Sequence, residues 1–232
     1  MVNQDSESRI KKFKKQNMKW AILGKGSISK LLYDLMIVEG FKKSDFMGFL
    51  VTQIEKSNSY SLEVYSSDFD FISEYQSLRI NEIKELPAID IYCSIGYSNM
   101  NKSRQDAFKN LKKFIPNCSI RSFISKEAYI CEDVEIEEGC LILPKSIVES
   151  SVKIKKGTVL WFGSHICHHS FISEFCWIAA QTTIGANCFI GERTFFGVGG
   201  IVPTGSKIAR GTLITAGSIS PQITKENQVI NP

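Results

Sequence analysis

The three histidines of this 232-residue chain lie within one five-residue window, as His165, His168 and His169. Imidazole titrates near neutral pH, so His168 could act as a general base that takes a proton from an amine or a hydroxyl. The HxxHH spacing could instead supply two or three nitrogen ligands to a metal ion, but no Asp, Glu or Cys pair at a recognised spacing completes the set. An incidental polar patch is the third interpretation. We favour the general base and predict no metal ligands.

The histidines fall inside a repeat of period six. From Ile124 to Ile214 every sixth residue is a branched aliphatic residue or Phe, and two positions before each stands a small residue or Val. A helix repeats at about 3.6 residues and a strand at about 2, so neither alone explains the pattern. It is typical of a parallel β-helix built from hexapeptide repeats, with three short strands in each eighteen-residue coil.

This repeat places the histidines relative to the core. Ile166 occupies an inward position, so His165 before it points outward from the strand. His168 and His169 follow Ile166 by two and three residues and fall at a corner between two faces. All three histidines are therefore expected outside the core. Ala186 follows His168 by eighteen residues and is expected beside it in the next coil.

The N-terminal half has the alternation of an α/β domain. We expect strands over 18–23, 46–51, 89–95 and 119–124, helices from the glycine turn after residue 23 to Gly40 and over 101–114, and a short element near 69–75. Strand, glycine turn, helix and strand open a small parallel sheet of Rossmann-like character. The predicted parts are a polar N-terminal tail (1–17), a Rossmann-like domain (18–122), an all-β domain with the parallel β-helix fold (123–220) and a C-terminal tail (221–232).

The turn after the first strand could hold a phosphate. Gly24, Gly26 and Ser27 stand where a helix N-terminus would offer backbone N–H groups to an anion. The full GxGxxG pattern is absent because Ser29 occupies the third glycine position, and no acid ends the second strand, which argues against NAD. A purely structural strand-to-helix turn is the alternative.

Composition and charge argue against several classes of function. The net charge is +4, and much of it comes from a lysine run over 11–15, which indicates a solvated tail and not a nucleic-acid-binding arm. No apolar stretch reaches the roughly 20 residues of a membrane span, and the polar N-terminus lacks a signal-peptide core. The seven cysteines form no CxxC pair, and Cys140, Cys176 and Cys188 fall at inward positions. We expect a reduced, cytoplasmic protein without nucleic-acid or membrane partners.

Two segments carry a resemblance to a known family: residues 94–104 (SIGYSNMNKSR) and residues 160–170 (LWFGSHICHHS). In these segments and in the order of its two domains, the chain resembles bacterial sugar acetyltransferases of the sialic-acid O-acetyltransferase and bacillosamine N-acetyltransferase type, over roughly 18–220. The resemblance implies a left-handed β-helix, a homotrimer with active sites between subunits, acetyl-CoA as donor and a nucleotide-linked sugar as acceptor. It also implies a place in bacterial lipopolysaccharide or O-antigen biosynthesis.

The resemblance further implies roles for individual residues. His168 matches the family's catalytic histidine, and His169 stands where many members carry an acid. His169 or His165 would orient His168, because the nearest acid along the chain, Glu174, falls on another face of the coil. Trp177 replaces a second histidine of many members and is, with His165, an expected substrate contact.

Acetyl-CoA would lie along the coils that follow the histidines. The backbone N–H of Ala186 would stabilise the thioester oxyanion, in the manner of other acyl-transfer enzymes. The implied cofactor contacts are Ala186, Asn187, Gly197, Lys207 and Arg210. Turn geometry is the alternative explanation for Gly197, and solvated surface charge for Lys207 and Arg210. The diphosphate of the sugar nucleotide would lie at Gly24, Gly26 and Ser27, although many relatives have Gly-His where this chain has Ser27-Ile28.

These observations predict an acetyl-CoA-dependent N-acetyltransferase that acts on the amino group of a nucleotide-linked amino-deoxysugar. The same base and oxyanion donor would serve a sugar O-acetyltransferase of the sialic-acid type, which is the first alternative. A non-catalytic trimeric scaffold or nucleotide-sugar-binding module is the alternative from another class. A metalloenzyme of the β-helical carbonic anhydrase kind is a third.

Overall fold

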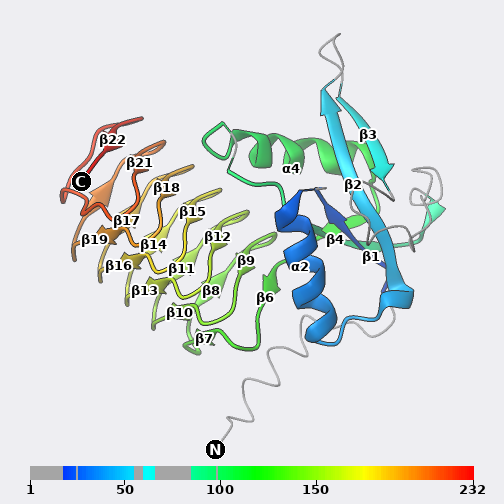
Figure 1. Ribbon diagram of the computed structural model, residues 1–232, viewed down its shortest axis with the longest axis horizontal. Coiled ribbons are helices and arrows are strands. Elements are labelled where there is room, and N and C mark those ends of the chain that lie inside the picture. Colours follow the sequence, from blue (N-terminus) through cyan, green and yellow to red (C-terminus); the bar gives the residue numbers. More distant parts are fainter. Residues whose placement is uncertain (1–17, 25, 55–59, 66–84, 98) are drawn as a thin grey trace, which may run out of the picture.

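The computed structural model describes residues 18–24, 26–54, 60–65, 85–97 and 99–232 (Figure 1). An α/β sheet with its helices lies at one end, and a stack of β-coils extends away from it (Figure 1). The expected tail over 1–17 and the short element expected near 69–75 lie outside the described residues. Among the described helices, none has the length and apolar character of a membrane span.

The N-terminal sheet has the strand order β3-β2-β1-β4-β5. Its elements are β1 (Trp20–Leu23), α2 (Ser27–Val38), η1 (Lys43–Asp45), β2 (Phe46–Ile54), β3 (Tyr60–Tyr65), β4 (Ile89–Cys93), α4 (Lys102–Phe114) and β5 (Cys118–Ile120). Strands β1 and β4 are buried throughout, as expected for central strands of a parallel sheet covered on both faces. Trp20 and Ile22 pack on the α2 side, and Ala21 and Leu23 pack on the α4 side.

The predicted Rossmann-like α/β architecture is confirmed, with one addition. Strands β1, β2, β4 and β5 pair in parallel, whereas β3 pairs with β2 in the antiparallel sense at the edge of the sheet. Strand β3 was not among the strands expected from the sequence. From β1 the chain goes to β2 on one side of the sheet and later returns to β4 on the other. The carboxyl ends of β1 and β4 therefore flank the topological switch point, where open α/β sheets bind ligands.

The predicted left-handed parallel β-helix is also confirmed. It consists of two-residue strands, which are β6 (Phe123–Ile124), β7 (Tyr129–Ile130), β8 (Glu135–Ile136), β9 (Leu141–Ile142), β10 (Ile147–Val148), β11 (Lys153–Ile154), β12 (Val159–Leu160), β13 (His165–Ile166), β14 (Phe171–Ile172), β15 (Trp177–Ile178), β16 (Thr183–Ile184), β17 (Phe189–Ile190), β18 (Phe195–Phe196), β19 (Ile201–Val202), β20 (Lys207–Ile208), β21 (Leu213–Ile214) and β22 (Val229–Ile230). They form three parallel sheets, which we call the β13, β14 and β15 sheets after their central members.

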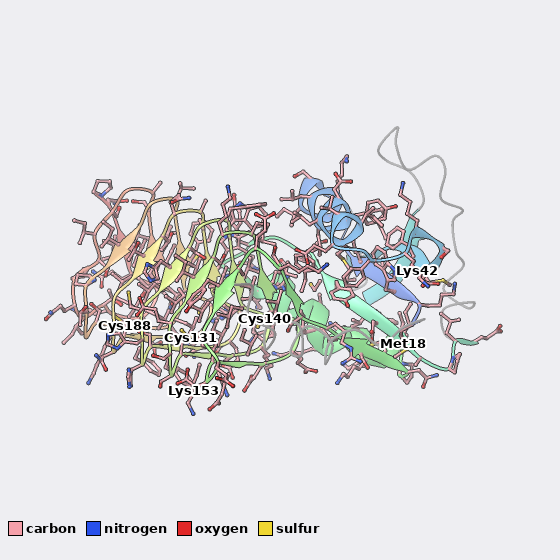
Figure 2. All side chains as sticks on the ribbon, turned by 90° about the horizontal axis from the view of Figure 1, so that it is seen from below. Met18, Lys42, Cys131, Cys140, Lys153 and Cys188 are labelled. Atoms are coloured by element: carbon pink, nitrogen blue, oxygen red, sulfur yellow. The ribbon has the colours of Figure 1, made fainter. Side chains whose placement is uncertain are left out.

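The inward-facing side chains of the repeat fill the centre of the β-helix. From Ile142 to Ile214 every sixth residue has at most 1% of its surface exposed. Each such aliphatic side chain contributes on the order of 1.5–3 kcal/mol by burial. The thiols predicted to face inward are buried too, and Figure 2 shows the labelled Cys140 and Cys188 within the coils while Lys153 extends outward. Burial raises the pKa of the Cys140 thiol to about 12, so it packs as a neutral, compact apolar group.

Two predicted boundaries are wrong. The closing strand expected over 119–124 is divided between β5 of the α/β sheet and β6 of the β-helix, because the chain turns from one sheet into the other at Arg121 and Ser122. The segment over 221–232 is not a tail outside the β-helix, because its strand β22 pairs in register with β21. Ile230 follows Ile214 by sixteen residues instead of eighteen, which is why the strict period does not find it.

A buried arginine forms hydrogen bonds to both the α/β domain and the β-helix. Arg104 on α4 has 1% of its surface exposed. Its guanidinium donates to the carbonyl of Cys93 (2.7 Å) in the sheet and to those of Gly139 (2.8 Å) and Gly157 (2.7 Å) on successive coils. Because these acceptors belong to both domains, the arginine fixes how the β-helix is mounted on the α/β sheet.

Candidate active site

The three histidines lie where the sequence analysis expected them, outside the core. His165 is half-buried on the outer side of β13, and His168 and His169 are exposed at the corner between the β13 and β14 sheets. Backbone bonds to the adjacent coils hold this segment, with His165 N–H donating to the Thr182 carbonyl (2.9 Å) and His169 N–H to the Ser150 carbonyl (3.1 Å). The side chains therefore project from a fixed backbone.

A carboxylate that the sequence analysis missed connects two of these histidines. Glu149 lies one coil earlier, with Oε1 2.8 Å from His165 Nε2 and Oε2 accepting the backbone N–H of His168 at 2.9 Å. These two hydrogen bonds hold the pKa of the Glu149 carboxyl below its usual value of 4.5. The bond from the His168 backbone N–H has the larger effect, and the bond with the His165 side chain comes second. Glu174 is the nearest acid along the chain, but Glu149 is the acid that contacts the histidine segment in space. The sequence could have indicated the position of Glu149, because this residue precedes Cys167 by the length of one coil and so lies beside it.

His168 and His169 contact each other through their rings. Their Nδ1 atoms are 3.0 Å apart, and the ring planes are nearly perpendicular at 89°. Such a pair is hydrogen-bonded only when one nitrogen carries a proton and the other does not, so the two tautomers are coupled. His169 adopts a left-handed conformation with φ 59°, as Asn187 does at the equivalent corner of the next coil (φ 55°). The turn therefore fixes His169 beside His168.

Ala186 lies in the coil next to His168, as expected. The N–H of its neighbour Asn187 donates to the His168 carbonyl at 3.0 Å, and the Ala186 carbonyl accepts from Gly205 N–H at 2.8 Å. Within the described part of the chain, no backbone hydrogen bond uses the Ala186 N–H. At the equivalent position one coil earlier, the His168 N–H is occupied by Glu149. The Ala186 N–H therefore has no backbone acceptor among the described residues, and Ala186 has 8% of its surface exposed.

The predicted phosphate turn lies at the switch point of the sheet. Gly24 has φ 131°, and a Cβ there would lie 2.5 Å from Ser94 Oγ, so glycine is required for this close approach. Gly26 and Ser27 are exposed at the start of α2, and a Cβ built at Gly26 meets nothing within 4 Å. The first turn of α2 has no acidic residue and no side-chain cap, so the helix dipole there is uncompensated, although Ser29 N–H already donates to the Gly26 carbonyl at 2.9 Å.

Several predicted site residues lie apart from the histidine corner. Trp177 faces the α/β sheet, where it stacks on Trp161 (5.4 Å between ring centroids) and contacts Tyr97 (5.3 Å). With 4% of its surface exposed, Trp177 offers little surface to a ligand within one chain, and its contact with substrate stays a prediction. It is a packing residue of the domain junction.

The expected cofactor residues are also spread over several faces. Asn187 is exposed at the histidine corner, and Lys207 is exposed on the adjoining β14 sheet. Arg210 lies beyond Lys207 and forms an ion pair with Glu226 at 3.5 Å. Gly197 follows β18 at another corner, where a Cβ would lie 2.4 Å from the backbone nitrogen of the next coil, so packing alone explains this glycine.

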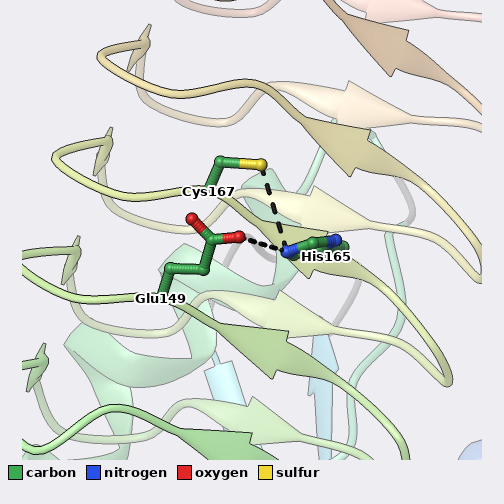
Figure 3. A group of neighbouring side chains, drawn as sticks. All are labelled: Glu149, His165 and Cys167. Carbon is green, nitrogen blue, oxygen red and sulfur yellow. Dashed lines mark hydrogen bonds and ion pairs between the residues drawn. The ribbon is translucent and has the colours of Figure 1, made fainter.

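Three potential metal ligands converge beside the histidine corner. Glu149, His165 and Cys167 each offer one ligand atom, and these atoms lie within 4.8 Å of one another (Figure 3). Cys167 Sγ is 4.0 Å from His165 Nε2. Burial, and then the nearby Glu149 carboxylate, raise the pKa of the Cys167 thiol. Spacing along the sequence showed no such partners for the histidines, because the carboxylate comes from the adjacent coil.

Comparison with solved structures identifies proteins of the same fold. The acetyltransferase domain of PglB from Neisseria gonorrhoeae FA1090, in complex with acetyl coenzyme A, aligns with TM-score 0.74 and 16% identity over 94% of this chain and 100% of that chain. A mutant of perosamine N-acetyltransferase from Caulobacter crescentus, in complex with CoA and GDP-perosamine, aligns with TM-score 0.71 and 16% identity over 92% and 91%. WeeI from Acinetobacter baumannii AYE aligns with TM-score 0.53 and 18% identity over 85% and 96%.

At these identities the likeness shows the shared fold alone. No protein-family model matches the chain.

Proposed function

We infer that the protein is an acetyl-CoA-dependent N-acetyltransferase that acts on the amino group of a nucleotide-linked amino-deoxysugar. The observation that carries this proposal is the pairing of an exposed histidine, His168, with an unused backbone donor, Ala186 N–H, on the next coil. The fold supports it, because structures that share both domains include an acetyltransferase domain in complex with acetyl coenzyme A and a perosamine N-acetyltransferase in complex with CoA and GDP-perosamine.

The histidine pair supplies the base. For Nε2 of His168 to accept a proton, the proton of the neutral His168 ring must be on its Nδ1. There it can form a hydrogen bond to Nδ1 of His169, which is 3.0 Å away. The sugar amine attacks the thioester carbonyl, His168 takes the amine proton, and the C–S bond breaks as the proton passes to the departing CoA sulfur. During attack the carbonyl oxygen gains negative charge, and the Ala186 N–H stabilises it.

The α/β domain provides the acceptor site in this proposal. The exposed start of α2 at Gly26 and Ser27 suits the diphosphate of a sugar nucleotide. CoA follows the coils beyond the histidines, past Asn187 and Lys207. We further propose a cytoplasmic homotrimer in which a neighbouring subunit completes each site; sedimentation should then give the mass of three chains.

The decisive experiment measures acetyl transfer by the His168→Ala and His168→Asn variants. Loss of a general base typically costs about 10²–10⁴-fold in rate, so both variants should lose that much kcat while still binding acetyl-CoA. Lys153→Ala removes an outward-facing side chain on the β14 sheet. It is the matched control and should keep full activity. A His168→Ala enzyme with unchanged activity would show that the corner is not the catalytic site.

A panel of acceptors distinguishes the alternatives. Purified protein with acetyl-CoA should acetylate nucleotide-linked amino sugars and leave the corresponding hydroxy sugars unmodified. Turnover with hydroxyl acceptors alone would establish a sugar O-acetyltransferase at the same site. Binding of nucleotide sugars without any turnover would indicate a binding module.

A further inference from the structure

We propose that Glu149, His165 and Cys167 form a binding site for one thiophilic divalent cation of the Zn²⁺ class. This site lies beside the proposed catalytic corner and uses the one histidine of the three that the base mechanism does not require. It goes beyond the acetyl-transfer proposal and does not depend on it.

The repeat itself brings the three side chains together. His165 and Cys167 are two residues apart along an extended chain, so they project to the same side. Glu149 occupies the position of Cys167 one coil earlier, so it lies directly alongside. Backbone hydrogen bonds hold both coils. The N–H of Glu149 donates to the Ile166 carbonyl (3.0 Å), and the N–H of Cys167 donates to the Ile184 carbonyl (2.9 Å). The ligands therefore start from a rigid frame.

The spacing of the ligand atoms is close to what a tetrahedral ion needs. Zn²⁺ bonds of about 2.0–2.2 Å to nitrogen or oxygen and about 2.3 Å to sulfur place tetrahedral ligands about 3.4–3.6 Å apart. The structure has 2.8 Å between Glu149 Oε1 and His165 Nε2, and 4.0 Å between His165 Nε2 and Cys167 Sγ. For these two pairs, side-chain shifts of roughly half an ångström reach that spacing. The third pair, the Glu149 carboxylate and Cys167 Sγ, lies within 4.8 Å. Three protein ligands leave a fourth position open to water.

The surroundings orient the carboxylate for this role. Glu149 Oε2 accepts the backbone N–H of His168 at 2.9 Å, which fixes the carboxylate plane and leaves Oε1 facing His165. Metal-ligating carboxylates are commonly held by such an outer hydrogen bond. On binding, the ion replaces the thiol proton of Cys167, so each ion bound releases one proton to solvent.

The position of Cys167 distinguishes it from the other thiols of the chain. Cys140, Cys176 and Cys188 face the centre of the β-helix with 0–2% of their surface exposed. Cys93 and Cys118 are buried in the α/β domain. Cys131 occupies the equivalent position two coils before Cys167 and lies outside the three-residue group. It therefore provides a matched control for a test of the site.

Cobalt titration tests the proposal on the full-length, reduced protein. Co²⁺ should bind at one per chain and produce tetrahedral ligand-field bands together with a thiolate-to-cobalt charge-transfer band, and Zn²⁺ should displace it. Cys167→Ser should abolish the charge-transfer band, and His165→Gln and Glu149→Gln should each weaken Co²⁺ binding by at least about tenfold. Cys131→Ser should leave the spectrum and the stoichiometry unchanged.

The outcomes that overturn the proposal are equally defined. The site does not exist if no charge-transfer band appears at saturating Co²⁺, if the band survives Cys167→Ser, or if it requires Cys131. Circular dichroism of each variant establishes that it is folded, so a lost band reports a lost ligand. Because the readout is spectroscopic, failure of acetyl transfer would leave this result intact, and the reverse also holds.

Discussion

At the scale of single residues, Glu149 connects two of the three histidines. One carboxylate oxygen faces the His165 ring and the other holds the backbone N–H of His168. The second contact positions the corner without touching the His168 ring, whose Nδ1 is left to His169. We therefore regard Glu149 as a positioning residue of the proposed reaction.

Removal of this carboxylate should lower activity. Glu149→Ala leaves the His168 N–H without its charged acceptor, and hydrogen bonds to charged groups contribute about 1.5–3 kcal/mol, so kcat/KM for acetyl transfer should fall at least about tenfold. Glu174→Ala removes an acid that lies on another face of the coil and should change kcat/KM little. Equal losses in the two variants would contradict the assignment.

The same carboxylate predicts how stability depends on pH. Its folded-state pKa lies below the ordinary value of 4.5, so its contribution is complete above about pH 4.5 and disappears as the pH falls through the folded value. Glu149→Gln should therefore lower the free energy of unfolding by about 1 kcal/mol near neutral pH, a value reduced by partial exposure. The difference from the unmodified protein should shrink in acid, as measured by urea unfolding. Glu132→Gln, at an exposed position, should show no such trend.

At the scale of elements, the coil length decides what lies beside what. The period of six predicted the inward residues, the outward direction of His165 and the neighbourhood of Ala186, and the structure confirms each of these. It could not predict Trp177 as a packing residue of the domain junction, because its partner there, Tyr97, belongs to the α/β domain and is far away in sequence. It also missed β22, where a shorter coil breaks the period.

Glycines of the β-helix test how closely the coils approach. At Gly197 an added Cβ would lie 2.4 Å from the backbone nitrogen of Ala216, and backbone cannot move aside as a side chain can. Gly197→Ala should therefore reduce stability by about 1–3 kcal/mol. Gly26→Ala is the control, because its φ is −82° and nothing lies within 4 Å. Thermal unfolding that shows the two variants to be equally stable would contradict this account.

At the scale of the whole molecule, the two domains are joined by a buried cation whose partners are main-chain carbonyls. Arg104 donates to Cys93 in the sheet and to Gly139 and Gly157 in the coils. An aromatic cluster of Tyr97, Trp161 and Trp177 packs beside this junction. Together they hold the switch point of the sheet in a fixed relation to the β-helix.

Loss of this arginine should weaken the whole structure. Arg104→Met keeps much of the side-chain volume but leaves buried carbonyls unsatisfied at about 1–3 kcal/mol each, so stability should fall by at least about 3 kcal/mol. Arg104→Lys keeps the charge but not the planar set of donors and should recover only part of the loss. Urea unfolding measures both, and a fully stable Arg104→Met protein would show that the packing of the junction suffices.

The stacking of residues eighteen apart also limits how the length of such a chain can change during evolution. Insertion or deletion of one whole coil keeps every inward residue inward and every face in line, so the corner of His168 is preserved. A change of six residues keeps the core but rotates the following segment onto the next face, which would separate His168 from Ala186. A change that is not a multiple of six shifts the inward positions, unless a shortened coil restores the register, as it does before Ile230, which pairs with Ile214 sixteen residues earlier. Related chains should therefore differ in length between the histidine corner and the C-terminus by whole coils.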